Sequence, residues 1–203
     1  LKFLGKTNKK IKIGMLKGNF FSVKKHFEVK KTLSYFINYY DTQRVKSFNI
    51  KKGREILLSN KKRLSKKENF FVDAYLSYLW NESLKLYLGE KFQGEILFEN
   101  NIEFFIPSNL NIDKLPKFWT IPGYKVKLEE SEEFYEEILK REGFTLDFFL
   151  DVLKNRRIKG DYRRLYEKVE YFSEKGNYIS FYLNKGAYAT MLLKFLYAEN
   201  IVF

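Results

Sequence analysis

Cysteine is absent from the 203 residues, and histidine occurs only once, as His26. The lack of cysteine excludes disulfides, a thiolate nucleophile and cysteine-ligated zinc, and it is compatible with a reducing compartment. With one histidine, neither a catalytic triad that uses imidazole nor a histidine-rich metal site is expected. We therefore predict that the protein holds no metal ion and uses no thiolate or histidine-triad chemistry.

Long apolar runs are missing as well. No segment approaches the ~20 apolar residues that span a bilayer, and no signal-peptide pattern opens the sequence. These absences predict a soluble, cytoplasmic protein with no membrane partner, and we expect it to be a monomer.

Acidic residues are scarce in the first third of the chain. Residues 1–67 contain 20 Lys or Arg against 3 Asp or Glu, whereas residues 68–203 contain 18 against 22, and the net charge is +13. A field of this sign attracts a polyanion. RNA or DNA is favoured over a membrane, because the basic run has no amphipathic helix of low net hydrophobicity beside it. The alternative is a solvated, lysine-rich face.

Hydrophobic residues make up 45% of the chain and aromatic residues 19%, enough for a packed core in one large or two small domains. Apolar alternation on both sides of Gly18-Asn19 predicts a hairpin, or two strands joined less tightly. Strands are also expected on both sides of Gly176-Asn177, and a helix capped by Thr190 near the end. Helical periodicity covers residues 49–60, 68–88, 129–144 and 145–156, with Gly143 as a C-cap, and residues 90–127 are expected to form short strands and loops.

The order of these elements predicts an α/β fold of the α+β type. Strand-forming segments lie near both ends of the chain and helices dominate between them. We therefore expect the two ends to pair in a mixed sheet around a middle section.

Three short motifs follow one another along the chain. Residues 16–21 read "LKGNFF", residues 38–45 read "NYYDTQRV", and residues 184–190 read "NKGAYAT". Tyrosine faces, an amide and an arginine in the second motif suit stacking on bases and contact with phosphate. Each motif by itself is equally compatible with ordinary turns and packing.

Taken in order, these motifs resemble the TruD family of tRNA pseudouridine synthases. That family has Lys-Gly-Asn-x-Phe, Asn-Tyr-Phe-Gly-x-Gln-Arg and Pro-x-Gly-Ser-Tyr-Ala-Thr segments, matched here by residues 17–21, 38–44 and 184–190. Between them, "AYLSYLWNESL" (residues 74–84) is similar to the family's Ser-x-Leu-Phe-Asn helix. "IKGDYRRL" (residues 158–165) is similar to its Gly-x-Arg-Arg-x-Leu turn. The resemblance extends along the whole chain.

The resemblance implies an enzyme that isomerises uridine in tRNA, at position 13 in bacterial members, with an aspartate nucleophile and no cofactor. It implies a mixed-sheet catalytic domain of the pseudouridine synthase type, formed by residues 1–38 and 166–203 and interrupted by an insertion domain at residues 39–165. Asn19 matches the residue that orients the nucleophile, and Phe21 matches the active-site phenylalanine. The RNA contacts implied are Lys17, Tyr39, Gln43, Arg44, Arg163, Lys185 and Tyr188.

The chain departs from the family in ways that bear on activity. The nucleophile lies in a Lys-Asp-x-x-Ala-x-Thr-x-Gln segment before the first motif, and no such segment occurs in the 203 residues, which begin with Leu1. We therefore expect this chain alone to be inactive. Asp41 replaces a family glycine and Val45 a phenylalanine; Asp41 is a candidate substitute nucleophile, but a turn residue beside Thr42 is the simpler interpretation.

Two other functions remain compatible with the sequence. One is a noncatalytic RNA-binding protein or remnant that keeps the cleft without the reaction. The other is a basic structural or ribosome-associated protein whose motifs match by accident. Finding the nucleophile segment upstream would favour the enzyme, whereas a genuine start at Leu1 would favour the remnant.

Overall fold

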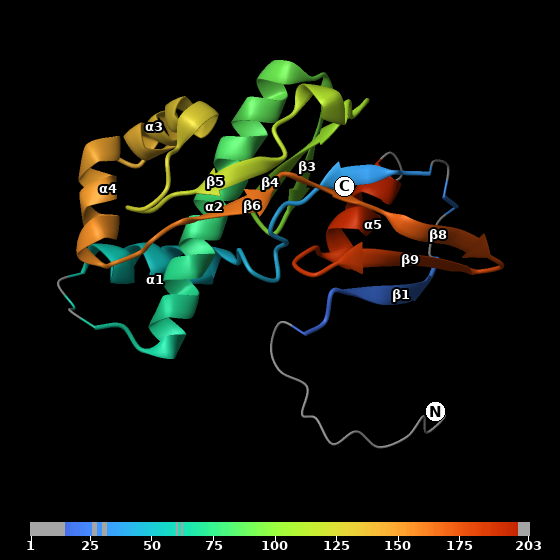
Figure 1. Ribbon diagram of the computed structural model, residues 1–203, viewed down its shortest axis with the longest axis horizontal. Helices are drawn as coiled ribbons and strands as arrows, with labels where there is room; N and C mark the ends of the chain where they lie inside the picture. Colours follow the sequence, from blue (N-terminus) through green and yellow to red (C-terminus); the bar gives the residue numbers. More distant parts are fainter. Residues whose placement is uncertain (1–14, 26–27, 30–31, 60, 62, 199–203) are drawn as a thin grey trace, which may run out of the picture.

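A computed structural model describes residues 15–25, 28–29, 32–59, 61 and 63–198. Helices gather at one end of the molecule, and a three-stranded sheet with one helix forms the other end (Figure 1). The helices are α1 (Ser47–Leu58), α2 (Lys66–Lys91), α3 (Glu132–Arg141), α4 (Leu146–Asn155) and α5 (Ala189–Tyr197). The strands are β1 (Gly18–Lys24), β2 (Tyr35–Ile37), β3 (Gly94–Glu99), β4 (Ile102–Pro107), β5 (Phe118–Ile121), β6 (Asp161–Arg164), β7 (Tyr166–Lys168), β8 (Glu170–Lys175) and β9 (Tyr178–Asn184). The expected mixture of helices and strands is confirmed.

The sheet at the second end has the strand order β1-β9-β8, and both pairings are antiparallel. β8 and β9 form the hairpin expected at residues 176–177, where Gly176 has a φ of +55°. Pairing of β1 with β9 confirms that segments near the two ends of the chain come together.

The hairpin expected at Gly18-Asn19 is wrong. Both residues lie inside β1, opposite Asn184 and Leu183 of β9, and residues 10–14 of the expected first strand lie outside the described residues. Gly18 is required by close approach and not by a turn, since a Cβ there would lie 2.3 Å from the Leu183 carbonyl oxygen. The Gly-Asn signal therefore marks a strand packed tightly against β9.

The four central helices form where periodicity predicts them. The N-cap of α2 is Ser65, which forms a capping box with Glu68. Gly143, with a φ of +84°, ends α3, and the Phe144 amide donates to the Leu139 carbonyl across the turn. α1, α2, α3 and α4 enclose a cluster of buried apolar side chains that includes Leu57, Leu139 and Phe149.

Short antiparallel pairs connect the two ends of the molecule. β3 pairs with β4, β5 with β6, and β2 with β7. The ladder of β2 and β7 ends at Ile37 and Tyr166, which is where the sequence places the boundaries between residues 1–38, 39–165 and 166–203. That division into domains stays a prediction.

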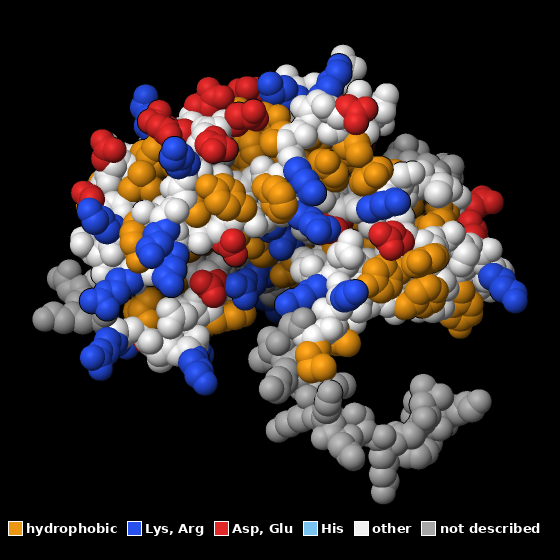
Figure 2. Space-filling model, in the orientation of Figure 1, with side chains coloured by type: hydrophobic (Ala, Val, Ile, Leu, Met, Phe, Trp, Pro, Cys, Tyr) orange, Lys and Arg blue, Asp and Glu red, His pale blue; other side chains and the backbone are white. Residues whose placement is uncertain are grey.

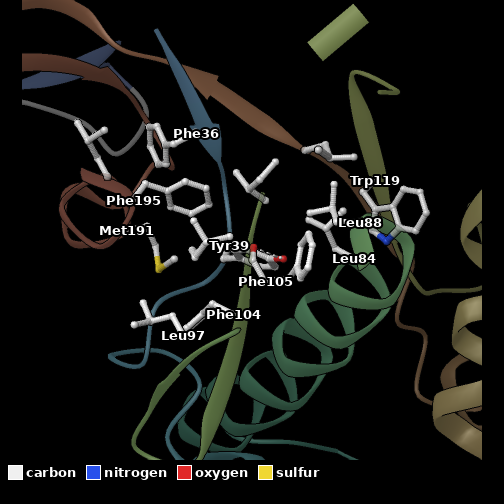
Figure 3. Close-up of a cluster of buried hydrophobic side chains, with 14 of the residues drawn as sticks. Phe36, Tyr39, Leu84, Leu88, Leu97, Phe104, Phe105, Trp119, Met191 and Phe195 are labelled. Carbon is white, nitrogen blue, oxygen red and sulfur yellow. Dashed lines mark hydrogen bonds between the residues drawn. The ribbon is translucent and has the colours of Figure 1, made fainter. Parts of the chain in front are cut away.

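A second core cluster joins these parts. Phe36 of β2 and Met191 and Phe195 of α5 pack beside Phe104 of β4 and Leu84 and Leu88 of α2, with Tyr39 among them (Figure 3). This core draws on residues on both sides of the predicted boundaries. Within the described ranges, none of the helices combines the length and the apolar character needed to cross a membrane.

The expected cap at Thr190 is wrong by two positions. α5 begins at Ala189, and Tyr188 occupies the N-cap position. Thr190 lies in the first turn of the helix, where its hydroxyl donates a hydrogen bond to a carboxylate oxygen of Asp41. Tertiary contact with Asp41 therefore replaces local capping as the role of this side chain.

Candidate functional site

Arg163 connects three of the motifs identified in the sequence. It lies on β6, and its Nε donates to the Asn38 carbonyl oxygen at 3.0 Å. One terminal nitrogen donates to Asn38 Oδ1 at 2.8 Å and to the Gly186 carbonyl oxygen at 3.0 Å. The guanidinium thus holds the loop that follows β2 against the loop that follows β9.

Aromatic rings surround the same guanidinium. Its central carbon lies 4.0 Å from the ring centre of Tyr40, 5.5 Å from that of Trp80 and 5.9 Å from that of Tyr188. Burial lowers the pKa of Arg163, although the neighbouring Tyr40, Tyr188 and Glu167 act in the opposite direction. Burial likewise raises the pKa of Tyr188. Cation–π contacts of this kind stabilise a partly desolvated arginine, so Arg163 organises the site as well as facing it.

The helix motif in residues 74–84 explains how Tyr40 is held. Asn81 is fully buried in α2, and its side-chain oxygen accepts from the Tyr40 amide at 2.9 Å. Its Nδ2 donates to the Tyr40 carbonyl oxygen at 2.7 Å. Trp80 of the same helix packs edge-on against the Tyr40 ring. The two motifs therefore form one unit, with both backbone polar groups of Tyr40 satisfied by a single amide.

A cavity of about 400 Å³ opens beside this unit, and we call it the basic cleft. Figure 2 shows a hollow near the centre of the molecule with Lys and Arg side chains gathered around it. Lys17 and Lys185 lie together at its sheet side, because the Lys185 amide donates to the Lys17 carbonyl oxygen at 2.8 Å. The lining residues are Lys17, Asn38, Tyr40, Phe118, Ile121, Asp161, Tyr162, Arg163, Arg164, Glu167, Asn184, Lys185 and Gly186.

The lining of the basic cleft holds four cationic side chains, Lys17, Arg163, Arg164 and Lys185, against two acidic ones, the exposed Asp161 and the buried Glu167. Glu167 is 3% exposed and accepts from Arg164 and from the Asn184 side chain, both at 3.4 Å. Lys17 and Lys185 are exposed, and within the described residues neither has an acidic partner. Two ammonium groups beside half-buried and exposed aromatic rings suit a phosphate backbone with a base nearby.

Asn19 and Phe21 lie next to the basic cleft on β1, two and four residues after Lys17. They share one face of the strand, opposite Leu183 and Phe181. Asn19 is exposed, and the half-buried Phe21 ring stacks on Phe181 with centres 5.5 Å apart. Both side chains are thus on the sheet face that packs toward the core, and neither belongs to the described lining of the cleft.

The remaining residues expected to contact RNA have different surroundings. Tyr39 is fully buried and its hydroxyl donates to the Phe105 carbonyl oxygen at 3.3 Å, so it is a core residue and not an RNA contact. Burial raises its pKa far above the ordinary value. Gln43 is exposed, and Arg44 lies over the Phe70 ring, 5.0 Å from its centre. Gln43 and Arg44 lie outside the described lining of the cleft.

Sequence reasoning missed Tyr40, Trp80 and Arg164 in this site. Each lies inside a motif quoted from the sequence, at residues 38–45, 74–84 or 158–165, so motif membership was a usable signal. Choosing between neighbours required knowing which way each side chain points. Adjacent residues in an extended segment face opposite sides, and Tyr40 faces the cleft while Tyr39 faces the core.

Asp41 is held in a buried polar cluster and is not free to react. Its carboxylate accepts from the Thr190 hydroxyl, the Lys194 ammonium and, at 2.8 Å, the Thr42 amide. Lys194 also lies 2.6 Å from Glu99, which accepts from the Thr42 hydroxyl at 2.7 Å. The Asp41 carbonyl accepts from the Arg44 amide, as in a turn. The interpretation of Asp41 as a turn residue is therefore confirmed.

Comparison with known proteins identifies the same family along most of the chain. A family model described as tRNA pseudouridine synthase D (TruD) matches residues 28–196. The probable tRNA pseudouridine synthase D of Nanoarchaeum equitans is 25% identical over 277 aligned residues, which cover 100% of this chain and 72% of that protein.

Two further relatives match at higher identity over shorter stretches. The probable tRNA pseudouridine synthase D 2 of Methanocaldococcus jannaschii is 33% identical over 152 residues, with 63% of this chain and 35% of that protein covered. The tRNA pseudouridine synthase D of Helicobacter acinonychis is 34% identical over 119 residues, with 51% and 31% covered. The chain thus spans about a third of the length of these two proteins.

Proposed function

Because the chain belongs to the tRNA pseudouridine synthase D (TruD) family, we propose that it forms the RNA-binding cleft and part of the catalytic domain of an enzyme that converts uridine to pseudouridine in tRNA. The observation that carries this proposal is the family match over residues 28–196. The convergence of the motifs on Arg163 supports it, because segments far apart in the sequence meet at one basic cleft. We further propose position 13 of the tRNA as the target.

The reaction defines what the protein must supply. The bond from N1 of uracil to C1′ of ribose breaks, the base rotates, and a bond from C5 to C1′ forms; the proton leaves C5 and N1 gains one. The product is an isomer, so no oxidant, reductant or group donor is consumed. The base must leave the stack and be received by an aromatic surface, with a carboxylate near the ribose.

We assign these tasks to residues of the basic cleft and of the neighbouring strand β1. Lys17 and Lys185 neutralise phosphates at its rim, Tyr188 and Tyr40 present aromatic surface beside Arg163, and Phe21 receives the flipped base. Asn19, exposed at the start of β1, orients the nucleophilic aspartate. The same proposal divides the chain into catalytic-domain pieces at residues 1–38 and 166–203 and an insertion domain at residues 39–165.

Binding of tRNA is expected to weaken steeply with salt. Each phosphate neutralised by the protein contributes about 0.7 to 0.9 to the slope of log affinity against log salt. Filter binding of labelled tRNA across a salt series measures this slope. Lys17→Gln/Lys185→Gln should lower it by about 1.5, whereas Lys91→Gln/Lys175→Gln, which removes two charges outside the described cleft lining, should leave it unchanged. A flat response of the unaltered chain would contradict the proposed RNA interface.

In an active form of the enzyme, Phe21→Ala is expected to lower turnover about ten- to a hundredfold, because stacking on a flipped base is worth ~1–3 kcal/mol. Asn19→Ala should slow the chemical step and leave tRNA affinity unchanged. Phe20→Ala is the matched control, since Phe20 lies on the opposite face of β1 and is 62% exposed. Single-turnover rates and tRNA affinities are measured together, with thermal unfolding to verify folding. Wild-type rates in both Phe21→Ala and Asn19→Ala would show that the two roles are wrongly assigned.

A noncatalytic RNA-binding protein is the second candidate. One observation favours it: the exposed ammonium groups of Lys17 and Lys185 and the rings beside Arg163 can contact RNA without the family's nucleophile segment. The two candidates share the basic cleft and therefore predict the same tRNA binding. They differ in whether pseudouridine forms once that segment is supplied.

A further inference from the structure

A second and larger cavity lies at the helical end of the molecule. It has a volume of about 840 Å³ and is formed by the end of α1, by Ser59, Lys61 and Arg63 after it, and by Phe144 and α4. Figure 2 shows Lys and Arg side chains gathered at the lower left, where Figure 1 places the ends of these two helices. We call it the helical pocket; it is lined by Leu57, Leu58, Ser59, Lys61, Arg63, Phe144, Phe148, Val152, Asn155, Arg156 and Arg157. Among described residues, none lines both this pocket and the basic cleft.

The helical pocket is basic, and part of its charge is uncompensated. None of the described lining residues is acidic. Lys61 pairs with Glu68 at 2.6 Å, but within the described chain Arg63 and Arg157 have no acidic partner. Arg157 has a φ of +58°, a left-handed conformation that is uncommon for a residue with a side chain. It directly follows the C-cap of α4, where the Ile158 amide donates to the Leu153 carbonyl oxygen at 2.9 Å, so this conformation ends the helix.

Two aromatic rings complete the pocket. Phe144 and Phe148 stack with their centres 5.6 Å apart and an interplanar angle of 18°. Arg54 lies over Phe144, 4.8 Å from its ring centre, and is fixed by Glu142 at 2.9 Å. Phe148 remains 48% exposed. The Phe144 ring is therefore held in place by Arg54, and the exposed Phe148 ring offers a surface on which a planar group can stack.

Arg156 links the two helices that line the pocket. Its guanidinium donates to the carbonyl oxygens of Ile56 and Leu57 at 3.1 Å, and to Ser59. These acceptors lie at and just beyond the carboxyl end of α1, where terminal carbonyls lack helical partners. The arginine links α4 to the end of α1, so the packing of these two helices determines the shape of the cavity.

We propose that the helical pocket binds a single-stranded segment of RNA, with a base on Phe148 and backbone phosphates at Arg63 and Arg157. An exposed ring beside unpaired guanidinium groups matches the two contacts that such RNA needs, base stacking and phosphate neutralisation. A lipid surface would instead need apolar side chains projecting outward around the cations. The inference rests on the proposed function, because it makes this pocket a second point of contact for the same tRNA.

The test is a salt series of tRNA binding to residues 1–203 that carry Arg63→Gln/Arg157→Gln. Loss of two phosphate contacts should lower the slope of log affinity against log salt by about 1.4, at ~0.7 for each contact with single-stranded RNA. That corresponds to about 25-fold weaker binding at ~0.1 M salt, relative to ~1 M. Lys140→Gln/Arg141→Gln on α3 removes the same charge outside the described pocket lining and should change neither quantity.

A second variant tests stacking separately from charge. Phe148→Ala should weaken tRNA binding about tenfold with the slope unchanged, whereas Phe98→Ala, which removes an exposed ring from β3, should have no effect. Equal binding by the pocket variants and their controls would overturn the inference while leaving the proposed function intact, provided Lys17→Gln/Lys185→Gln still weakens binding. The inference would also be overturned if Arg63→Gln/Arg157→Gln lost binding to vesicles of anionic phospholipid while its tRNA binding stayed unchanged.

Discussion

Residues 1–203 alone are expected to release no tritium above background from tRNA that carries labelled uridine at C5. Release of the C5 proton follows only after the base has rotated, which requires a carboxylate at the ribose. The segment that carries this aspartate in the family is absent from the 203 residues. The conspicuous internal alternative, Asp41, is 3% exposed and bonded to Thr190, Lys194 and the Thr42 amide. Preorganised cations and amides cannot replace the missing covalent or general-base step.

Supplying a polypeptide that bears the family's Lys-Asp-x-x-Ala-x-Thr-x-Gln segment should produce tritium release with the same chain. The same polypeptide with Asn in place of that Asp is the control and should give none. Activity from residues 1–203 alone would contradict the prediction, and Asp41→Asn would then be the first variant to measure. Tight tRNA binding without release, even with the segment supplied, would favour the noncatalytic RNA-binding protein.

Lys194→Met is expected to lower the free energy of unfolding by about 3 kcal/mol. The ammonium group is the cation that faces both Asp41 and Glu99, whose side chains are 4% and 34% exposed. Breaking a buried ion pair by removing one partner costs ~3–5 kcal/mol, because the other charge stays buried. Partial exposure of Glu99 places the effect at the lower end of that range. Urea unfolding measures it, and Lys52→Met is the control, since its pair with Glu55 is about half exposed and contributes under ~0.5 kcal/mol.

Removing the charge of Asp41 as well as that of Lys194 should restore part of the lost free energy of unfolding. Asp41→Asn/Lys194→Met leaves a neutral amide among hydroxyl and amide donors, so the double variant should be more stable than Lys194→Met. Asp41→Gly, which introduces the family's residue, should also destabilise the chain. Asp41 is not one of the described residues with positive φ, so glycine would bring no conformational relief there. Equal, small losses for Lys194→Met and Lys52→Met would show that the cluster is too hydrated to matter.

The sequence predicted where the candidate site lies better than it predicted which side chains contact one another there. Motif order indicated Lys17, Arg163 and Lys185, which meet at the basic cleft, and it indicated the family. It did not separate Tyr39 from Tyr40, because the direction of each side chain depends on which neighbour the segment packs against. Tyr39 meets the core through Phe105, and Tyr40 is held by Asn81 so that its ring faces Arg163.

Local chemistry by itself determined the four central helices, the turns at Gly143 and Gly176, the basic character of the first third and the family signature. Helical periodicity, capping and left-handed glycine are properties of a few consecutive residues, so they can be read without knowing the rest of the fold. Tertiary structure decided the role of Gly18, Thr190 and Asp41. Gly18 belongs to a strand because β9 lies against it, and Thr190 bonds to Asp41, 149 residues away in the chain. Buried polar groups need hydrogen-bond partners. The fold decides which partner lies beside each of them, and closeness in the sequence does not predict that choice.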